Sequence, residues 1–190
     1  MRSRFVYLSA LALSLPAVAA PDVYINDPAH TAASFEVGHQ GVSWIRGRFN
    51  AVESKIVLDR TAKQGTIDAV IRTASLDTGH EARDRVVRSE DYLNAEKFPT
   101  MTFKATKLKF EGDNVVGADG ELTLAGVTRP VSLDIPFFKC VPNPARKTEQ
   151  CGADVRTMIK RSDFGVKRGA TTPMADEVKI AIQIEAYKQQ

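Results

Sequence analysis

The chain has 190 residues, of which 43% are hydrophobic and 26% are charged, and this composition is sufficient for one globular domain with a sizeable core. Its formal charge at pH 7 is only +3, and two of the basic residues, Arg2 and Arg4, lie in the leader described next. No basic patch is interleaved with aromatic side chains, so the composition argues against a nucleic-acid partner.

Residues 1–19 have the pattern of a secretory signal peptide. A basic start is followed by an uncharged apolar run over residues 5–15, and Ala17-Val18-Ala19 offers the small side chains that signal peptidase requires. A membrane anchor is the alternative, but the run is about half as long as the roughly 20 residues of a spanning helix. We therefore predict cleavage before Ala20, export from the cytoplasm and a mature domain of residues 20–190.

Alternation of apolar and polar residues is the main pattern after residue 30, and it predicts strands with one buried face. It is clearest near the C-terminus, where Val178, Ile180, Ile182 and Ile184 alternate with polar or small residues. In chain order, the predicted strands cover residues 31–38, 46–58, 66–72, 100–110, 116–124, 131–137, 152–161 and 178–187. Within residues 100–110 the apolar phase slips, which indicates a β-bulge.

Between the third and fourth predicted strands the periodicity changes. Thr78-Gly79-His80-Glu81 has the pattern of a capping box and predicts a short helix that ends at Arg88. Val86, Val87 and Leu93 are expected on its buried side. A further helical turn is predicted at residues 42–45.

Eight consecutive antiparallel strands with mostly short connections fit either a β-sandwich or an up-and-down barrel, and closure into a barrel removes exposed edges. The predicted fold is therefore all-β, an eight-stranded antiparallel barrel with a short helix between strands 3 and 4. The interior of such a barrel is either packed with side chains or holds one elongated ligand. The periodicity does not choose between these two fillings.

Cys140 and Cys151 are the only cysteines, and they flank a stretch rich in proline and charge. We predict a disulfide that closes this loop, which would persist only in an oxidising compartment. A catalytic or metal-binding pair is the alternative. The CxxC spacing is absent and no histidine lies nearby in the sequence, which favours the disulfide.

Signatures of enzymes are absent from the sequence, which has no Gly-x-Ser-x-Gly motif, no paired-histidine motif and no phosphate-binding glycine loop. His30, His39 and His80 lie on different predicted elements without ligand spacing, so we predict neither a metal site nor a cofactor. The charged residues between Arg83 and Asp91 fit a solvated helix face. Alternatively, one arginine among them points inward and meets a phosphorylated ligand head.

Several short motifs follow one another along the chain. They are Asp27-Pro28-x-His30, Phe35-x-Val37-x-His39, Gly47-x-Phe49, Ser75-Leu76-x-Thr78-Gly79, Arg83-Asp84, Arg88-Ser89-x-Asp91-Tyr92-Leu93, Phe98-Pro99-x-Met101-x-Phe103, Gly120-x-Leu122-x-Leu124-x-Gly126-Val127-Thr128-x-Pro130 and Arg161-Ser162-Asp163-Phe164-Gly165. In order and spacing these motifs resemble the YceI-like family over nearly all of the mature chain. The insertion between the two cysteines is a departure, because many relatives lack it.

The resemblance implies a lipocalin-like barrel, often dimeric, with a tunnel that binds a polyisoprenoid or a similar amphiphilic chain in the bacterial periplasm. No catalytic activity comes with the family. Some relatives are associated with b-type membrane cytochromes, which suits an isoprenoid quinone as cargo. A polyisoprenoid, a quinone or a fatty-acid-like molecule is therefore the expected ligand. The expected partners are a second copy of the chain and a membrane cytochrome or another lipid-handling protein.

The residues predicted to bind this ligand fall into three groups. The tunnel wall is expected to consist of Phe35, Val37, Phe49, Ile67, Phe103, Leu122, Leu133, Ile135, Ile180 and Ile182. The helical end is expected to hold Trp44, Val86 and Leu93. The candidates for the head group are His39, Arg83, Arg88 and Arg161. For every apolar residue in these groups, an ordinary packed core is the alternative.

The predicted function is non-catalytic binding, transport or storage of this lipid in the periplasm of a Gram-negative bacterium. Two other classes of protein stay open. A stress-related periplasmic protein that acts through a protein partner would need an exposed apolar patch. A lipid-modifying isomerase or hydrolase would need a positioned acid or base, for which His39 with Asp84 is the candidate pair.

Overall fold

The computed structural model describes residues 20–190, and the predicted signal peptide lies outside this range. The strands are β1 (Asp22–Asn26), β2 (Ala32–His39), β3 (Ser43–Phe49), β4 (Val52–Asp59), β5 (Gln64–Arg72), β6 (Leu76–Asp77), β7 (Thr100–Glu111), β8 (Asn114–Leu124), β9 (Val127–Asn143), β10 (Thr148–Lys160) and β11 (Glu177–Lys188). The α-helices are α1 (Glu81–Arg88) and α2 (Pro173–Asp176), and three short 3-10 helices cover Pro28–His30, Thr73–Ser75 and Arg161–Phe164.

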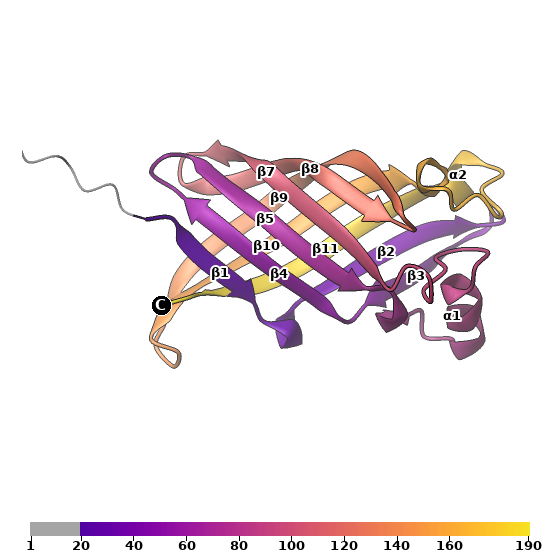
Figure 1. The fold of residues 1–190 in the computed structure, drawn as a ribbon, viewed down its shortest axis with the longest axis horizontal. Coiled ribbons are helices and arrows are strands. Elements are labelled where there is room, and N and C mark those ends of the chain that lie inside the picture. Colours follow the sequence, from indigo (N-terminus) through magenta and orange to yellow (C-terminus); the bar gives the residue numbers. More distant parts are fainter. Residues whose placement is uncertain (1–19) are drawn as a thin grey trace, which may run out of the picture.

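All of these strands form one antiparallel sheet in the order β1-β4-β5-β7-β8-β9-β10-β11-β2-β3-β6, and a further pairing of β1 with β11 closes it into a barrel (Figure 1). Both β1 and β2 pair with β11, so they act as one long strand that the 3-10 helix Pro28–His30 interrupts. In the same way, β3 and β4 act as one strand interrupted at residues 50–51, and β5 and β6 as one strand interrupted by the 3-10 helix Thr73–Ser75. The predicted eight-stranded antiparallel barrel is thereby confirmed.

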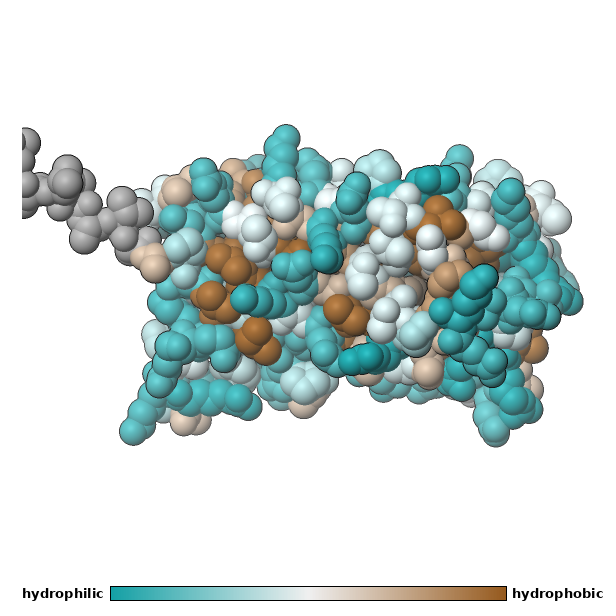
Figure 2. All heavy atoms as spheres, in the orientation of Figure 1, coloured by the Kyte–Doolittle hydropathy of each residue, from teal (hydrophilic) through white to brown (hydrophobic). Residues whose placement is uncertain are grey.

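The outer surface of the barrel is mainly polar. Figure 2 shows hydrophilic side chains over most of one face, with hydrophobic side chains in separate small patches. Most inward-facing side chains are apolar, and the buried cluster includes Phe103, Leu108 and Ile135. This division follows from the alternation along each strand, because successive side chains point to opposite faces of a sheet.

The predicted short helix is confirmed as α1, but its first turn differs from the expected capping box. His80 is the N-cap, and its Nδ1 accepts a hydrogen bond from the backbone N–H of Arg83 at 3.3 Å. Thr78 instead donates its backbone N–H and its hydroxyl to Asp84, at 2.9 and 2.5 Å. The carboxylate of Asp84 therefore anchors the helix to the segment that links it to β6.

The helical turn predicted at residues 42–45 is wrong. Gln40 and Gly41 have φ values of +52° and +74°, so the chain reverses at this point and returns directly as β3. Trp44 then pairs with Gly38 on β2. Since His39 already pairs with Ser43, only residues 40–42 connect the two strands, and no room is left for a helical turn.

The predicted disulfide between Cys140 and Cys151 is confirmed, but it does not close an irregular loop. β9 and β10 continue past the cysteines to a turn at residues 144–147, and Cys140 lies directly opposite Cys151 in the ladder, with 4.0 Å between their Cα atoms. The bridge therefore ties two neighbouring strands at one end of the barrel.

The predicted bulge in β7 is also confirmed. The register between β7 and β8 shifts between Ala105 and Lys107, and again between Lys109 and Phe110. The first shift keeps Leu108 on the inner face, where its side chain is buried.

Candidate functional site

A cavity of about 1010 Å³ occupies the inside of the barrel. Its volume is at the upper end of the usual range for ligand pockets, roughly 300–1,000 Å³. On β11 it is lined by every second residue from Val178 to Ala186, as the alternation of that strand requires. The interior of this barrel is therefore a cavity with apolar walls and not a core packed solid with side chains.

Most of the residues predicted from the sequence to contact a ligand do line this cavity. They are Phe35, Val37, His39, Phe49, Ile67, Arg83, Val86, Leu93, Phe103, Leu122, Leu133, Ile135, Arg161, Ile180 and Ile182. The structure thus brings them together around one space. That they bind a ligand stays a prediction.

Two of the predicted residues lie elsewhere. Trp44 points to the outer face of β3, where Lys179 Nζ lies 4.3 Å from its ring centroid, while its neighbour Ile45 lines the cavity. The expected helical turn had given Trp44 the wrong phase. Arg88 turns back beneath α1, donates to the carbonyl of Leu76 and lies 3.8 Å from the carboxylate of Asp84. Its guanidinium therefore anchors the helix and does not face the cavity.

An aromatic pair forms part of the wall on β2 and β3. Gly47 lies opposite Phe35, and a Cβ at Gly47 would come within 2.6 Å of the Phe35 ring. The ring therefore lies across the glycine, with its centroid 5.8 Å from that of Phe49. Both rings line the cavity at this point.

One end of the cavity is open to solvent, and we call it the mouth. It is formed by the turn at residues 39–41, by α1 and by residues 169–175, and several of its lining residues are exposed. Figure 1 shows that α1, α2 and the β2–β3 turn gather at this end of the barrel. Val86 of α1 lines the cavity although its side chain is 52% exposed.

Two arginines are held in fixed orientations at the mouth. Arg83 donates from Nε to Thr78 Oγ1 at 2.9 Å and from Nη2 to the carbonyl of Thr78 at 2.7 Å. Arg161 donates from Nε to the carbonyl of Ala175 at 2.7 Å and from Nη1 to that of Arg168 at 2.8 Å. Since a guanidinium carries five N–H donors, each side chain keeps further donors for a ligand at the cavity entrance.

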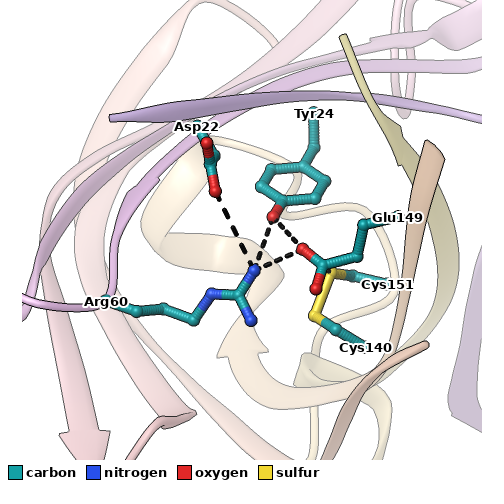
Figure 3. Close-up of a disulfide and its surroundings, with 6 residues drawn as sticks. All are labelled: Asp22, Tyr24, Arg60, Cys140, Glu149 and Cys151. Carbon is teal, nitrogen blue, oxygen red and sulfur yellow. Dashed lines mark hydrogen bonds and ion pairs between the residues drawn. A yellow bond between two sulfur atoms is a disulfide. The ribbon is translucent and has the colours of Figure 1, made fainter. Parts of the chain in front are cut away.

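The opposite end is closed by a group of residues that we call the floor, namely Tyr24, Arg60, Glu149 and the Cys140–Cys151 disulfide (Figure 3). The Tyr24 hydroxyl donates to Glu149 Oε1 at 2.5 Å and accepts from Arg60 Nη2 at 2.8 Å. Arg60 also forms an ion pair with Glu149. Burial raises the pKa of the Tyr24 phenol above its ordinary value, and the hydrogen bond to Glu149 adds to the rise.

Apart from the disulfide, the floor was not predicted from the sequence. Tyr24 belongs to β1, a strand of five residues that the alternation did not reveal, and its partners lie 36 and 125 positions away in the chain. No local motif joins these residues. Only closure of the barrel brings them together.

Cys140, Glu149 and Cys151 have side-chain ligand atoms within 4.8 Å of one another, and they are the only such group of potential metal ligands within residues 20–190. Both sulfur atoms are bonded to each other, so neither is available as a thiolate. In the same part of the chain, no helix is long and apolar enough to cross a membrane.

Fold and cavity together define a class of protein, a closed antiparallel barrel of lipocalin-like type that encloses one elongated apolar site. The family model of the YceI-like domain matches residues 24–186 of this chain. The chain therefore belongs to the YceI-like family, as the motifs had indicated.

Relatives over the whole chain agree with this assignment. A UPF0312 protein of Vibrio campbellii is 32% identical over 190 residues, which is 98% of each chain. Protein YceI of Salmonella agona is 32% identical over 186 residues, covering 97% of this chain and 96% of its own.

Two solved structures show the same fold. The crystal structure of Burkholderia cenocepacia BcnA is 27% identical with a TM-score of 0.71, and the match covers 84% of this chain and 98% of that one. A polyisoprenoid binding domain from Saccharophagus degradans, at 18% identity, has a TM-score of 0.64 over 87% of this chain and 98% of its own.

Proposed function

We propose that the protein binds a polyisoprenoid or a similar amphiphilic lipid inside the barrel, and that it carries or stores this lipid without chemical change. The observation that carries the proposal is the apolar cavity of about 1010 Å³, closed at the floor and open at the mouth. The polyisoprenoid binding domain of Saccharophagus degradans has the same fold, which supports this ligand class.

The physical driving force is the removal of a hydrocarbon tail from water. Burial contributes about 0.8 kcal/mol per methylene-sized group, so one five-carbon isoprenoid unit contributes on the order of 4 kcal/mol before the cost of ordering the chain. A tail of a few units is therefore sufficient for tight binding, and a small polar molecule would gain little from these walls.

The polarity of the two ends sets the orientation of the lipid. A phosphate or quinone head would lose its hydration against the apolar wall, whereas Arg83 and Arg161 offer it hydrogen-bond donors at the mouth. The tail therefore points toward Tyr24 and the head stays near α1. His39, at the end of β2, lines the same entrance and is the third candidate for contact with the head.

We also propose where the protein acts and what it contacts. A disulfide suits an oxidising compartment, which supports the periplasm as the site of action. A second copy of the chain, or a membrane cytochrome that uses an isoprenoid quinone, would load or unload the cargo through the mouth.

The lipid-modifying alternative has less support. Asp84 is buried, and its carboxylate already accepts two hydrogen bonds from Thr78. No hydrogen bond joins it to His39 within residues 20–190, so the candidate acid–base pair is not assembled.

The test is to purify the exported protein natively from the periplasm, extract it with organic solvent and analyse the extract by mass spectrometry. We expect a polyprenyl or quinone species in stoichiometric amount. A folded protein that carries no lipid, and that takes up none from a polyprenol suspension, would contradict the proposal.

A further inference from the structure

The ring of Tyr24 is the innermost surface of the cavity. Its side chain is only 1% exposed, and it lines the cavity together with Leu58, Cys151 and Ala186, which are also buried. The hydroxyl of the ring points toward Arg60 and Glu149 (Figure 3), and neither of these two residues lines the cavity. The space available to a ligand therefore ends at this aromatic side chain.

The position of the ring is fixed from several sides. Tyr24 pairs with Lys188 on β11 and with Ile56 on β4, so its backbone lies in the seam that closes the barrel. Its hydroxyl is held by Glu149 at 2.5 Å and by Arg60 at 2.8 Å. Since a buried hydroxyl without a partner costs free energy, a rotation of the ring away from these groups is unfavourable.

Charged groups block the space beyond the ring. Arg60 is paired with Glu149 and lies 4.0 Å from Asp22, which in turn is 2.6 Å from Lys188 Nζ. An apolar chain that passed this point would separate these ion pairs and remove charged groups from water, which costs far more than the tail gains.

The disulfide holds the acidic member of the floor in place. Glu149 comes two residues before Cys151 on β10, and its Oε1 lies 4.0 Å from Cys151 Sγ. The bond to Cys140 ties this part of β10 to β9. Tyr24 is therefore supported by a partner that is itself covalently anchored.

We propose that Tyr24 sets the length of hydrocarbon tail that the cavity accepts, an inference that rests on the function proposed above. β11 lines the cavity from Val178 to Ala186, a span of about 26 Å along the strand at roughly 3.3 Å per residue. With the usual strand tilt of about 40°, this is a depth of about 20 Å along the barrel axis. A tail that reaches the ring has used this depth, and further units must fold back or remain at the mouth.

The experiment is a competition between tails of different length. Delipidated protein is incubated with an equimolar mixture of farnesol, geranylgeraniol and solanesol, and native mass spectrometry reports which alcohol is bound. Tyr24→Ala is expected to shift binding toward the longer alcohols by about tenfold for every two further methylene-sized groups that become buried. Tyr24→Phe keeps the ring and should retain the wild-type preference.

A second variant acts in the opposite direction. Ala186→Leu fills the same end of the cavity from β11 and should shift binding toward the shorter alcohols. Thermal unfolding checks that each variant is folded. If Tyr24→Ala does not fold, Ala186→Leu alone tests the length limit. An unchanged preference in a folded variant would overturn the length limit alone. A wild-type protein that binds none of the three alcohols would overturn the proposed function, and the length limit with it.

Discussion

Leu133 lines the cavity from β9, while its neighbours Ser132 and Asp134 are exposed. In a packed core, an arginine at this position would prevent folding. Here the cavity gives the longer side chain room, so we expect Leu133→Arg to fold but to lose bound lipid, because a charge now occupies the path of the tail. Lipid content by mass spectrometry and thermal unfolding measure the two effects.

The matched control for this variant is Met158→Arg. Met158 lies on the outer face of β10 with its side chain 56% exposed, so the same charge there should leave the lipid content unchanged. If Leu133→Arg is folded and still carries the wild-type amount of lipid, Leu133 does not face the ligand.

Arg83 offers a test of the head-group end. A hydrogen bond between a guanidinium and a phosphate is charge-assisted, so Arg83→Gln should weaken binding of farnesyl phosphate by about tenfold or more relative to farnesol. The control is Arg85→Gln on the same helix, since Arg85 pairs with Glu81 and does not line the cavity. An equal loss of affinity for both ligands would mean that Arg83 only supports the fold of α1.

At the scale of elements, α1 depends on the ionised form of Asp84. Hydrogen bonds from Thr78 lower the pKa of this carboxyl below its usual value. Because the pKa is lowered in the folded state, the stabilisation is complete at neutral pH and is lost as the pH falls below about 4. Asp84→Asn should therefore be less stable than wild type at pH 7 in urea unfolding, and the difference should shrink at pH 3.

Glu81→Gln is the control for this pH dependence, because Glu81 is an exposed carboxylate in the first turn of the same helix. Its effect on stability should be small at both pH values. A stability difference for Asp84→Asn that does not change between pH 7 and pH 3 would show that the carboxyl is not the group that titrates.

The disulfide between β9 and β10 makes a separate contribution to the stability of the fold. Its two cysteines are 11 positions apart in the chain, and the Cys140→Ala/Cys151→Ala double variant should lower the free energy of unfolding by about 3 kcal/mol. Urea unfolding of the double variant, and of wild type with and without a reductant, measures this. If reduced wild type is as stable as the oxidised form, the bridge does not stabilise the fold.

The sequence predicted the long strands well because each of them has one buried face, and alternation along β11 marks that face directly. The prediction failed where a strand is too short for alternation or where backbone conformation decides the structure. β1 is too short for a clear period, and the turn before β3 depends on positive φ values at Gln40 and Gly41 that an apolar run does not reveal. The cavity wall could therefore be predicted, whereas Trp44, which follows that turn, received the wrong phase.

The contacts of the floor could not be predicted from the sequence for a different reason. Tyr24, Arg60 and Glu149 meet only because the barrel closes, and no periodicity or motif connects them. Arg88 likewise appeared to be a ligand residue, since the sequence does not show that its guanidinium returns to the backbone of Leu76. Residues whose role depends on contacts distant in the chain require the three-dimensional structure.

For the whole molecule, occupancy of the cavity should raise stability, because a ligand that binds only the folded barrel shifts the unfolding equilibrium. At a free ligand concentration of 100 times Kd, the gain is about 2.7 kcal/mol. Delipidated protein should therefore melt at a lower temperature than the native preparation, and added geranylgeraniol should raise its melting temperature back to the native value. Equal melting temperatures of the lipid-free and lipid-loaded protein would contradict this.

The seam between β1 and β11 has a consequence for the order of folding. Tyr24, Ile25 and Asn26 pair with Lys188, Tyr187 and Ala186, so the barrel closes only when the two ends of the described chain meet. Contacts of such long range form late and slowly. Until then two strand edges and the inner wall face the solvent, and this open sheet is the species from which aggregation would start. Refolding yield should therefore depend more on how fast the last strand arrives than on the stability of the finished barrel.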